Sequence, residues 1–293
     1  MAVEPPTFED HFAGSSKRRP TDKESTMRFP TATFPLLGAA LILAVMTPLA
    51  SFGQSTTSSP IKNVVLVHGA WVDGSSWSKI IPLLQAKGLH GVAVQNPLTS
   101  FADDVAATKR MIDAQDGPVL LVGHSYGGAI ITEAGNNPKV TGLVYVAAFA
   151  PDAGETPGGL AKPFGPTPLF ANIQPIADGF LLLTAKGVNE DFAQDLSKAD
   201  KALVLATQGA TLGAVLEVKI STAAWRTKPS WFVVATNDRA IAPEQEKFTA
   251  KRMNSKTLVL PSSHVPMLSR PKDVANFIVD AASGKAKPTP PGS

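Results

Sequence analysis

The sequence contains no cysteine. This absence excludes disulfide bonds, thiol catalysis and thiolate metal sites. It does not define a cellular compartment, because an exported protein does not need disulfides. The 293 residues are 44% hydrophobic, so the chain can bury a sizeable core in one large domain or two small ones.

The chain also lacks a cluster of basic residues. Its formal net charge is +3, and the lysine and arginine residues are scattered along the sequence. A nucleic-acid-binding surface needs basic residues that gather in one segment or on one face. The sequence therefore predicts no nucleic-acid partner.

The apolar run at 35–50 is short for a membrane-spanning helix, which needs about 20 apolar residues, and Pro48 interrupts it. The run follows the basic residue Arg28 and precedes small polar residues, which is the layout of a secretory signal. We predict that residues 27–53 are a cleaved signal peptide, so that the protein is secreted or periplasmic and has no stable membrane partner. An uncleaved membrane anchor is the alternative.

The two ends of the chain have compositions that are poor in core-forming residues. Residues 1–26 are polar and contain several prolines, which predicts a disordered extension. Met27 is a candidate for the true start of the protein. Residues 284–293 are rich in proline and glycine and are predicted to form a flexible tail, which leaves residues 61–283 as the folded domain.

Short apolar runs rich in β-branched residues recur between residues 61 and 283. Such runs are typical of buried strands in a parallel sheet. Because helical patterns separate them, they predict an α/β fold with a mainly parallel six-stranded sheet flanked by helices. The runs are NVVLVHG at 63–69, HGVAVQ at 90–95, PVLLVG at 118–123, TGLVYVAA at 141–148, SWFVVAT at 230–236 and KTLVLP at 256–261.

The segments between these runs show helical spacing of apolar residues. Ser76 is predicted to cap a helix that carries Trp77, Ile80 and Leu84 on one face. Further helices are predicted from Phe101, Val105 and Ile112, from Ala129, Ile130 and Ala134, and from Val274, Phe277, Ile278 and Ala281.

Residues 150–228 interrupt the alternation of strands and helices. A structureless loop of this length is uncommon in a compact domain. Residues 157–185 contain only two charged side chains, Lys162 and Asp178, and residues 197–208 have the pattern of a capped helix. We predict a helical cap over the edge of the sheet, with a decorative insertion on its side as the alternative.

A serine lies between two glycines in Gly123-His124-Ser125-Tyr126-Gly127. This G-x-S-x-G pattern between a strand and a helix is typical of a nucleophile elbow, where a tight turn exposes the serine Oγ and only small residues fit two positions away. A phosphate-binding turn is the alternative. It would need a glycine at position 125 or a Gly-Lys-Ser/Thr ending, and both are absent.

A serine nucleophile needs a base, and the chain has only five histidines. His11 lies in the N-terminal extension, His90 begins a strand, and His68 ends the first strand. His124 precedes the serine, and its side chain is predicted to point away from the site. His264, in a loop after the last strand, remains as the predicted base.

The base in turn needs an acid that holds its tautomer. Asp238 follows a predicted strand and lies between Ser125 and His264 in the sequence. This gives the chain order Ser, Asp, His that the elbow pattern predicts. Asp152 follows the preceding strand and is the second choice. Glu244 and Glu246 lie on the helix after Asp238 and are predicted to be solvated.

The intermediate of acyl transfer carries an oxyanion that needs two donors. The backbone N–H of Tyr126, directly after the serine, is one predicted donor. The other is the N–H of Ala70 in the loop after the first strand, where Gly69 permits the turn and His68 braces the loop.

Four motifs carry a resemblance to a known family. VLVHGAW, GHSYGG, PSWFVVATNDRAIAPEQEKFTAKRM and SSHVPMLSRP resemble, in order and over about residues 62–282, the α/β-hydrolase superfamily. Within it the chain is similar to the small-esterase branch that includes plant methyl esterases and hydroxynitrile lyases. The resemblance implies the α/β-hydrolase fold, a serine esterase with no metal or cofactor, and a small-molecule ester as substrate.

Two other functions occur in the same superfamily. The hydroxynitrile lyases have a threonine after the first-strand histidine and a lysine after the catalytic histidine, where this chain has Gly69 and Val265. The resemblance therefore favours hydrolysis over cyanohydrin cleavage. A non-catalytic receptor for small ligands is the third possibility, and the complete set of Ser125, Asp238 and His264 argues against it.

The apolar character of residues 157–185 predicts an uncharged ester or lactone of modest size. Trp71 and Met267 are the candidates for substrate binding.

Overall fold

The computed structural model describes residues 61–284, 288 and 290–291. The predicted N-terminal extension and signal peptide therefore lie outside the described residues, as does most of the predicted tail. Within the described part, no helix is long and apolar enough to cross a membrane.

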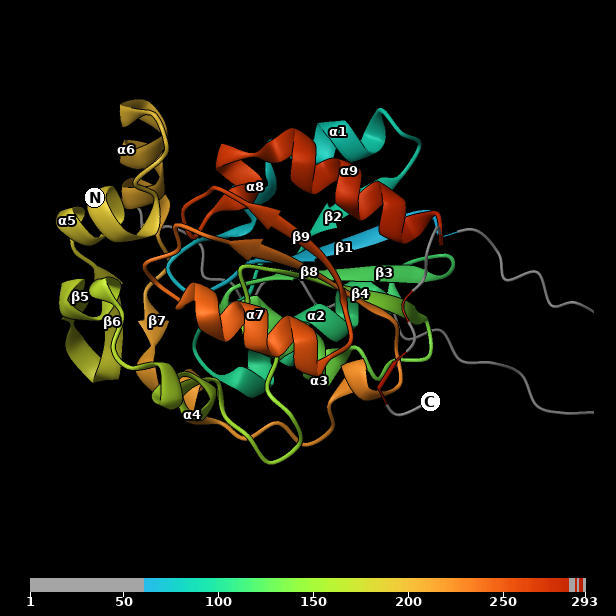
Figure 1. Cartoon of the computed structure of the whole chain (residues 1–293), viewed down its shortest axis with the longest axis horizontal. Helices are drawn as coiled ribbons and strands as arrows, with labels where there is room; N and C mark the ends of the chain where they lie inside the picture. The colour runs from blue at the N-terminus through green and yellow to red at the C-terminus, as the bar shows by residue number, and fades with distance from the viewer. Residues whose placement is uncertain (1–60, 285–287, 289, 292–293) are drawn as a thin grey trace, which may run out of the picture. The chain divides into compact units, whose positions relative to one another are not determined.

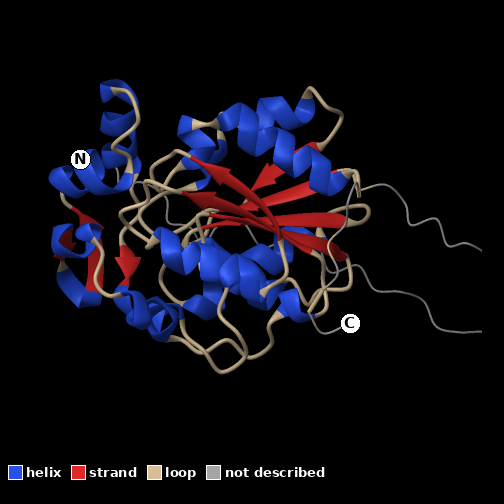
Figure 2. Cartoon of the chain, in the orientation of Figure 1, coloured by secondary structure: helices blue, strands red, loops and turns tan. Residues whose placement is uncertain are grey.

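A six-stranded sheet with the order β2-β1-β3-β4-β8-β9 forms the centre of the domain, and every neighbouring pair in it is parallel (Figures 1 and 2). All six strands coincide with the apolar runs, so the predicted fold class is confirmed. The strands are β1 (Asn63–Val67), β2 (His90–Ala93), β3 (Val119–His124), β4 (Val140–Val146), β8 (Ser230–Ala235) and β9 (Lys256–Leu260).

Burial along the strands explains their composition. The inner strands β1, β3 and β8 are buried at every position, because helices cover both faces of the sheet, and their residues are accordingly almost all apolar. The edge strands β2 and β9 are partly exposed. In register, Val67 of β1 lies opposite Gly123 of β3, and His124 lies opposite Val146 of β4, so these strands end at one edge of the sheet.

Helices cover the sheet from two sides. Figure 1 shows α1, α8 and α9 over one face and α2, α3 and α7 over the other. Their bounds are α1 (Ile81–Gln85), α2 (Phe101–Asp113), α3 (Tyr126–Ala134), α7 (Pro243–Arg252), α8 (Pro266–Ser269) and α9 (Pro271–Ala282).

The prediction of a helix capped by Ser76 is wrong. The segment instead forms a 3-10 turn, η1 (Gly74–Trp77), and Asp73 caps it by accepting a hydrogen bond from the N–H of Ser75 at 2.8 Å. The short helix α1 begins only at Ile81. Pro82 explains the break, because proline has no N–H to continue a helix from the preceding turn and is tolerated only in the first turn of a new one.

The segment between β4 and β8 is not purely helical, so the prediction of a helical cap is wrong in part. It also contains a three-stranded antiparallel sheet in the order β5-β6-β7. The elements of the whole segment between β4 and β8 are α4 (Pro157–Ala161), η2 (Lys162–Phe164), η3 (Pro168–Asn172), β5 (Ile173–Pro175), η4 (Ala177–Gly179), β6 (Phe180–Leu183), α5 (Ala185–Gly187), η5 (Val188–Phe192), α6 (Lys198–Thr207), β7 (Thr211–Leu212), η6 (Gly213–Glu217) and η7 (Ala224–Arg226).

The small sheet forms because the chain reverses between β5 and β6. Asp178 and Gly179 both adopt a positive φ, 58° and 79°, which a tight reversal requires. The apolar run Phe180–Leu183 then pairs with its neighbours on both sides. The predicted helix at 197–208 is present as α6, where Ser197 Oγ accepts the N–H of Asp200. We call residues 150–228 the cap below.

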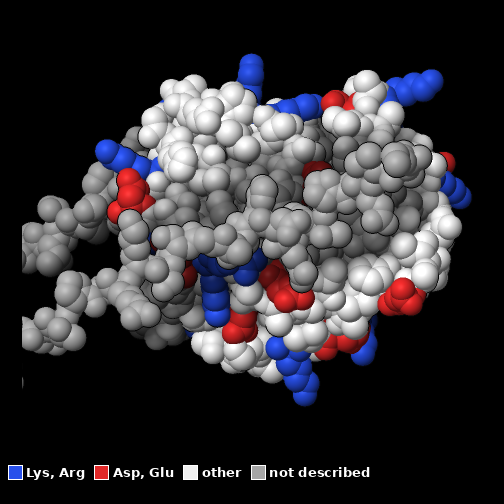
Figure 3. All heavy atoms as spheres, turned by 180° about the vertical axis from the view of Figure 1, so that it is seen from behind, with Lys and Arg blue, Asp and Glu red and all other residues white. Residues whose placement is uncertain are grey.

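Acidic and basic side chains are mixed on the described surface. On the face that Figure 3 shows, lysine, arginine, aspartate and glutamate side chains lie close to one another in the part drawn in white, blue and red. This mixture agrees with the scattered charges of the sequence.

Candidate active site

Ser125 occupies a strained turn between β3 and α3. Its φ is 53° and its ψ is −124°, values that a non-glycine residue adopts only where the surrounding structure imposes them. The carbonyl oxygen of Ser125 accepts the N–H of Gly128 at 2.9 Å and the N–H of Phe149 at 3.1 Å, and these bonds hold the turn. The geometry is that of the nucleophile elbow.

The glycines around Ser125 are required by close backbone packing. A Cβ atom at Gly123 would lie 2.6 Å from the carbonyl oxygen of Gly127, and one at Gly127 would lie 2.6 Å from the carbonyl oxygen of Val67. Both distances are shorter than a Cβ atom can accept, so β1, β3 and α3 can meet at this turn only with glycine at these positions.

His264 and Asp238 form a buried pair at the same edge of the sheet. His264 lies in the loop after β9, Asp238 lies in the turn after β8, and both side chains are almost completely buried. His264 Nδ1 lies 2.5 Å from Asp238 Oδ2. Asp238 Oδ1 accepts the N–H groups of Ala240 at 2.7 Å and Ile241 at 2.9 Å, which fixes the orientation of the carboxylate.

The cap contributes to the placement of His264. The ring of Phe192, from η5, meets the ring of His264 edge to face with 5.0 Å between ring centres. Asp195 Oδ2 accepts the N–H of Ser263 at 2.8 Å. These two contacts tie the loop that carries His264 to the cap.

The predicted direction of the His124 side chain is wrong. It does not point away from the site: its ring centre lies 4.8 Å from that of His264, and its Nε2 lies 2.8 Å from the carbonyl oxygen of His264. His124 is the last residue of β3, opposite Val146, and its ring reaches the loop of His264, which is 140 positions away in the sequence. Complete burial, followed by the proximity of His264, lowers the pKa of His124 well below its usual range.

The two predicted oxyanion donors lie at the same cavity as Ser125. Ala70 follows β1, Tyr126 begins α3, and both line the cavity with Ser125. His68 braces the loop that carries Ala70, because its Nε2 accepts the N–H of Asn96 at 2.9 Å and its Nδ1 lies 2.9 Å from the carbonyl oxygen of Gly69. Burial lowers the pKa of His68, so the ring is neutral, as this pattern of one acceptor and one donor requires.

A buried hydrogen bond between Tyr126 and Asp104 holds the first turn of α3. The hydroxyl of Tyr126 donates to Asp104 Oδ2 at 2.8 Å, and Asp104 Oδ1 accepts the N–H of Leu98 at 2.8 Å. Burial is the main cause that raises the pKa of Asp104 to about 6. Burial also raises the pKa of Tyr126, which therefore remains a neutral donor.

Trp71 joins the loop after β1 to the cap. Its backbone N–H donates to Thr211 Oγ1 at 3.1 Å, and its indole N–H donates to the carbonyl oxygen of Leu181 at 3.2 Å. Trp71 also lines the cavity, as predicted for a substrate-binding residue. Met267 is fully buried in the core and is not among the residues that line this cavity, so the structure does not place it at the site.

A cavity of about 470 Å³ lies between the cap and the edge of the sheet where Ser125 and His264 meet it. No direct hydrogen bond joins Ser125 Oγ to the His264 ring among the described residues, and such bonds often form only when substrate is present. Most of the lining side chains are apolar. Those from the cap include Leu169, Phe170, Ile173 and Leu216.

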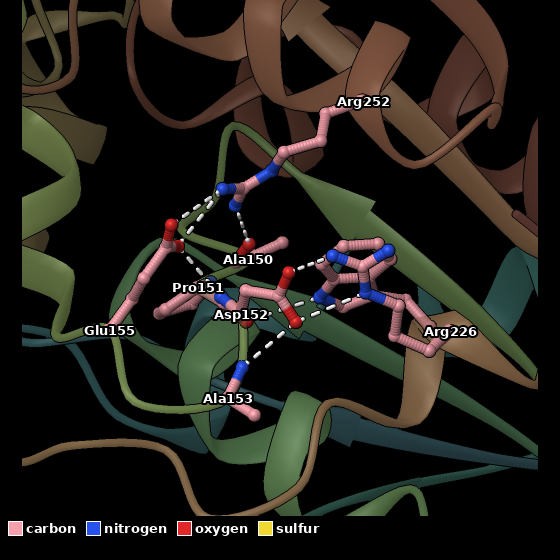
Figure 4. A network of polar contacts seen from close by, with 8 residues as sticks. Ala150, Pro151, Asp152, Ala153, Glu155, Arg226 and Arg252 are labelled. Carbon is pink, nitrogen blue, oxygen red and sulfur yellow. Dashed lines mark hydrogen bonds and ion pairs between the residues drawn. The ribbon is translucent and has the colours of Figure 1, made fainter. Parts of the chain in front are cut away.

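Asp152, the second choice for the acid, is engaged elsewhere. Figure 4 shows its carboxylate paired with Arg226 and with the N–H of Ala153. The hydrogen bonds from Arg226 lower the pKa of Asp152. Glu155 beside it binds Arg252 at 2.9 Å. This network joins the start of the cap to α7 and has no contact with His264.

Of the two glutamates that the sequence predicts to be solvated, Glu244 is exposed but Glu246 is not, so the prediction for Glu246 is wrong. Glu246 is fully buried, because α7 turns this side chain toward the end of β8 and the Asp238 turn.

The part of the chain that the structure describes contains no group of three or more histidine, aspartate or glutamate side chains that could hold a metal ion.

Residues 64–277 match the alpha/beta hydrolase family, and the chain belongs to it. The chain is 25% identical over 269 residues to a pyrethroid hydrolase from Sphingobium wenxiniae, covering 78% of this chain and 90% of that protein. It is 23% identical over 258 residues to methylesterase 1 from Arabidopsis thaliana, covering 75% of this chain and 96% of that protein.

Solved structures agree with this assignment at the level of the fold. The crystal structure of a pyrethroid hydrolase from Sphingobium faniae superposes with a TM-score of 0.67 at 23% identity, covering 77% of this chain and 99% of that one. The predicted resemblance to the small-esterase branch is therefore confirmed, and so is the broader prediction that the protein is a carboxylic ester hydrolase.

Proposed function

We propose that the protein cleaves a small uncharged carboxylic ester through a Ser125-His264-Asp238 triad and an acyl-enzyme. One observation carries the proposal. Ser125, on a strained elbow, opens onto the same apolar cavity as His264, whose ring is fixed 2.5 Å from Asp238. This is the arrangement that a weak serine nucleophile needs to become reactive.

In the first half-reaction, His264 accepts the proton of Ser125 Oγ while Oγ bonds to the ester carbonyl carbon. The carbonyl π electrons move to the oxygen, and the resulting oxyanion accepts hydrogen bonds from the N–H groups of Ala70 and Tyr126. Both groups lie at the cavity beside Ser125, and the N-terminus of α3 adds its positive end to the site. Asp238 stabilises the imidazolium.

The intermediate then collapses. The bond from the carbonyl carbon to the alcohol oxygen breaks, and His264 returns its proton to that oxygen. Water attacks the acyl-Ser125 ester with His264 as base, the bond to Oγ breaks, and His264 gives the proton to Ser125 as the carboxylic acid leaves. Each step uses only the triad, the two backbone donors and water.

The cavity supports an uncharged ester or lactone of modest size as substrate. The cap lines it mainly with apolar side chains, although Lys162 and Glu217 also line it, and this favours a hydrocarbon-rich substrate. A volume of about 470 Å³ is a usual size for a small-molecule site. Two relatives are named as a pyrethroid hydrolase and a methylesterase, and we propose that this chain acts on the same broad class of esters.

The lyase alternative is supported less well by the site. A Cβ atom at Gly69, where the lyases have threonine, would lie 2.7 Å from Ser125 Cβ and 2.9 Å from the carbonyl oxygen of His124. Val265, where the lyases have lysine, is completely buried and brings no charge to the cavity. Neither position offers the group that departing cyanide would need.

The experiment that tests the proposal measures hydrolysis of p-nitrophenyl esters of increasing chain length by the wild type and by Ser125→Ala. We expect Ser125→Ala to lose nearly all turnover, because the nucleophile is gone. Equal rates in the two proteins would refute the nucleophile. Tight binding of a small ligand without hydrolysis would support the receptor function instead, and cyanide release from a cyanohydrin would support the lyase.

A further inference from the structure

Glu246 is a fully buried carboxyl group directly behind the proposed triad. It lies in the first half of α7 and has no exposed surface. Its Oε2 accepts the N–H of Ala235, the last residue of β8, at 2.8 Å. An isolated buried carboxylate is costly, so the state of its second oxygen matters.

That second oxygen, Oε1, has no donor beside it among the described residues. The Asp238 turn lies next to this carboxyl group, because the N–H of Asp238 donates to the carbonyl oxygen of Ala235 at 3.3 Å, and the N–H of Ala235 donates to Glu246. After burial, the charge and side chain of Asp238 have the largest influence on Glu246. Two carboxylate groups can share a hydrogen bond only when one of them carries a proton, because an ionised carboxylate is an acceptor only.

The existing bonds of Asp238 decide which carboxyl group carries that proton. Asp238 already accepts the N–H groups of Ala240 and Ile241 and faces the ring nitrogen of His264. Three donors stabilise its ionised form. Glu246 has one backbone donor, and burial, followed by the charge of Asp238, raises its pKa well above the usual range. Lys247 on the same helix opposes this rise in pKa, but its effect is weak because its side chain is exposed.

We propose that Glu246 is a positioning residue, a neutral carboxylic acid whose O–H donates to the Asp238 carboxylate and holds it in line with His264. The proposal rests on the proposed triad. It adds a fourth side chain behind the proposed triad, and it gives Asp238 a further donor without adding a second negative charge beside the imidazole.

Two substitutions at Glu246 separate a neutral donor from an ionised carboxylate. In Glu246→Gln the amide can donate to Asp238 through its N–H and accept the N–H of Ala235 through its oxygen, so it reproduces the protonated acid. We expect it to keep kcat within about twofold and to leave the acidic limb of the kcat/KM profile in place. If Glu246 were ionised, Gln would remove a negative charge near His264 and move that limb to lower pH, which would overturn the proposal.

Glu246→Leu removes the donor to Asp238 and keeps the side chain buried. We expect kcat to fall by about tenfold with little change in KM, since the loss affects the alignment of the triad and not the cavity. Glu244→Gln, which neutralises an exposed glutamate in the same helical turn, is the matched control and should retain wild-type kinetics. A folded Glu246→Leu protein with wild-type kcat would refute a positioning role.

Infrared spectroscopy tests the protonation state without using activity. Above neutral pH, where Asp104 with its pKa of about 6 is ionised, the wild type should still show the C=O stretch of a protonated, buried carboxylic acid, and Glu246→Gln should lose that band. If the wild-type spectrum does not contain it, the proposal is wrong, even if Glu246→Leu fails to fold. This readout also separates the two proposals, because a failed triad would appear as activity in Ser125→Ala while the infrared band would be unchanged.

Discussion

The rings of His124 and His264 lie side by side, with 4.8 Å between their centres, and His124 Nε2–H donates to the carbonyl oxygen of His264 at 2.8 Å. The residue before the proposed nucleophile is thereby bonded to the loop that carries the proposed base. Because burial keeps the pKa of His124 low, its ring remains neutral and brings no competing charge to the site.

Replacing His124 by phenylalanine tests this relationship. The aromatic ring would fill the same space, but the hydrogen bond to the His264 loop would be lost. We expect kcat to fall by about fivefold to tenfold with little change in KM, which corresponds to one neutral hydrogen bond. Steady-state kinetics of ester hydrolysis and a melting curve for each protein would check this. His90→Gln, which changes an exposed histidine at the start of β2, is the control. Wild-type kcat in a stable His124→Phe protein would contradict the role.

Asparagine substitutions at Asp238 and Asp152 distinguish the two candidate acids. In serine hydrolases, loss of the triad carboxylate lowers kcat by about 10⁴-fold because the histidine takes the wrong tautomer. We expect a loss of this order for Asp238→Asn, whose carboxylate lies 2.5 Å from His264 Nδ1. Asp152→Asn should keep kcat and weaken only its contact with Arg226. The reverse result, measured with one p-nitrophenyl ester, would mean that Asp152 is the acid.

Local patterns in the sequence were sufficient to predict the sheet and the serine turn. Each strand of the sheet coincides with a short, mainly apolar run, and glycine is required at 123 and 127 by the backbone atoms that crowd the turn at Ser125. His264 was predicted by elimination among five histidines, and the structure brings it to the cavity of Ser125.

The features that sequence patterns missed depend on contacts between distant segments. The helix α7 is strongly polar, so Glu246 resembles its exposed neighbours, and only the packing of α7 against β8 and the Asp238 turn buries it. The strands of the cap are too short for their periodicity to be detected, and they exist because they pair with one another. Nothing in the local sequence reports the contact of His124 with a residue 140 positions away.

The predicted signal peptide can be tested by N-terminal sequencing of the protein recovered from a host with a secretion pathway. Residues 27–53 combine a basic start, an apolar run and a small-residue exit, so we expect cleavage and a mature chain that begins near residues 51–56. An intact Met1 in protein from the soluble fraction would contradict export by cleavage. Recovery of the uncleaved chain from the membrane fraction would indicate the anchor instead.

The buried pair of Asp104 and Tyr126 makes a pH-dependent contribution to stability. The pKa of Asp104 is raised to about 6 in the folded protein, so folding favours its protonated form. The stabilisation from this group is complete below the unfolded pKa of about 4 and is lost as the pH rises through about 6. The buried histidines His68 and His124 act in the opposite direction, because their lowered pKa values make the folded state less stable as the pH falls below about 6.5.

Asp104→Asn separates the pH dependence caused by Asp104 from that caused by His68 and His124. The variant keeps both histidines but has no titrating group at position 104. We therefore expect the free energy of unfolding of the variant, relative to the wild type, to increase between pH 4 and pH 7 by at most about 3 kcal/mol. Urea unfolding of both proteins at several pH values would measure this difference. A difference that does not change with pH, or that changes in the opposite sense, would mean that folding does not raise the pKa of Asp104 and that its bonds from Tyr126 and Leu98 offset the cost of its burial.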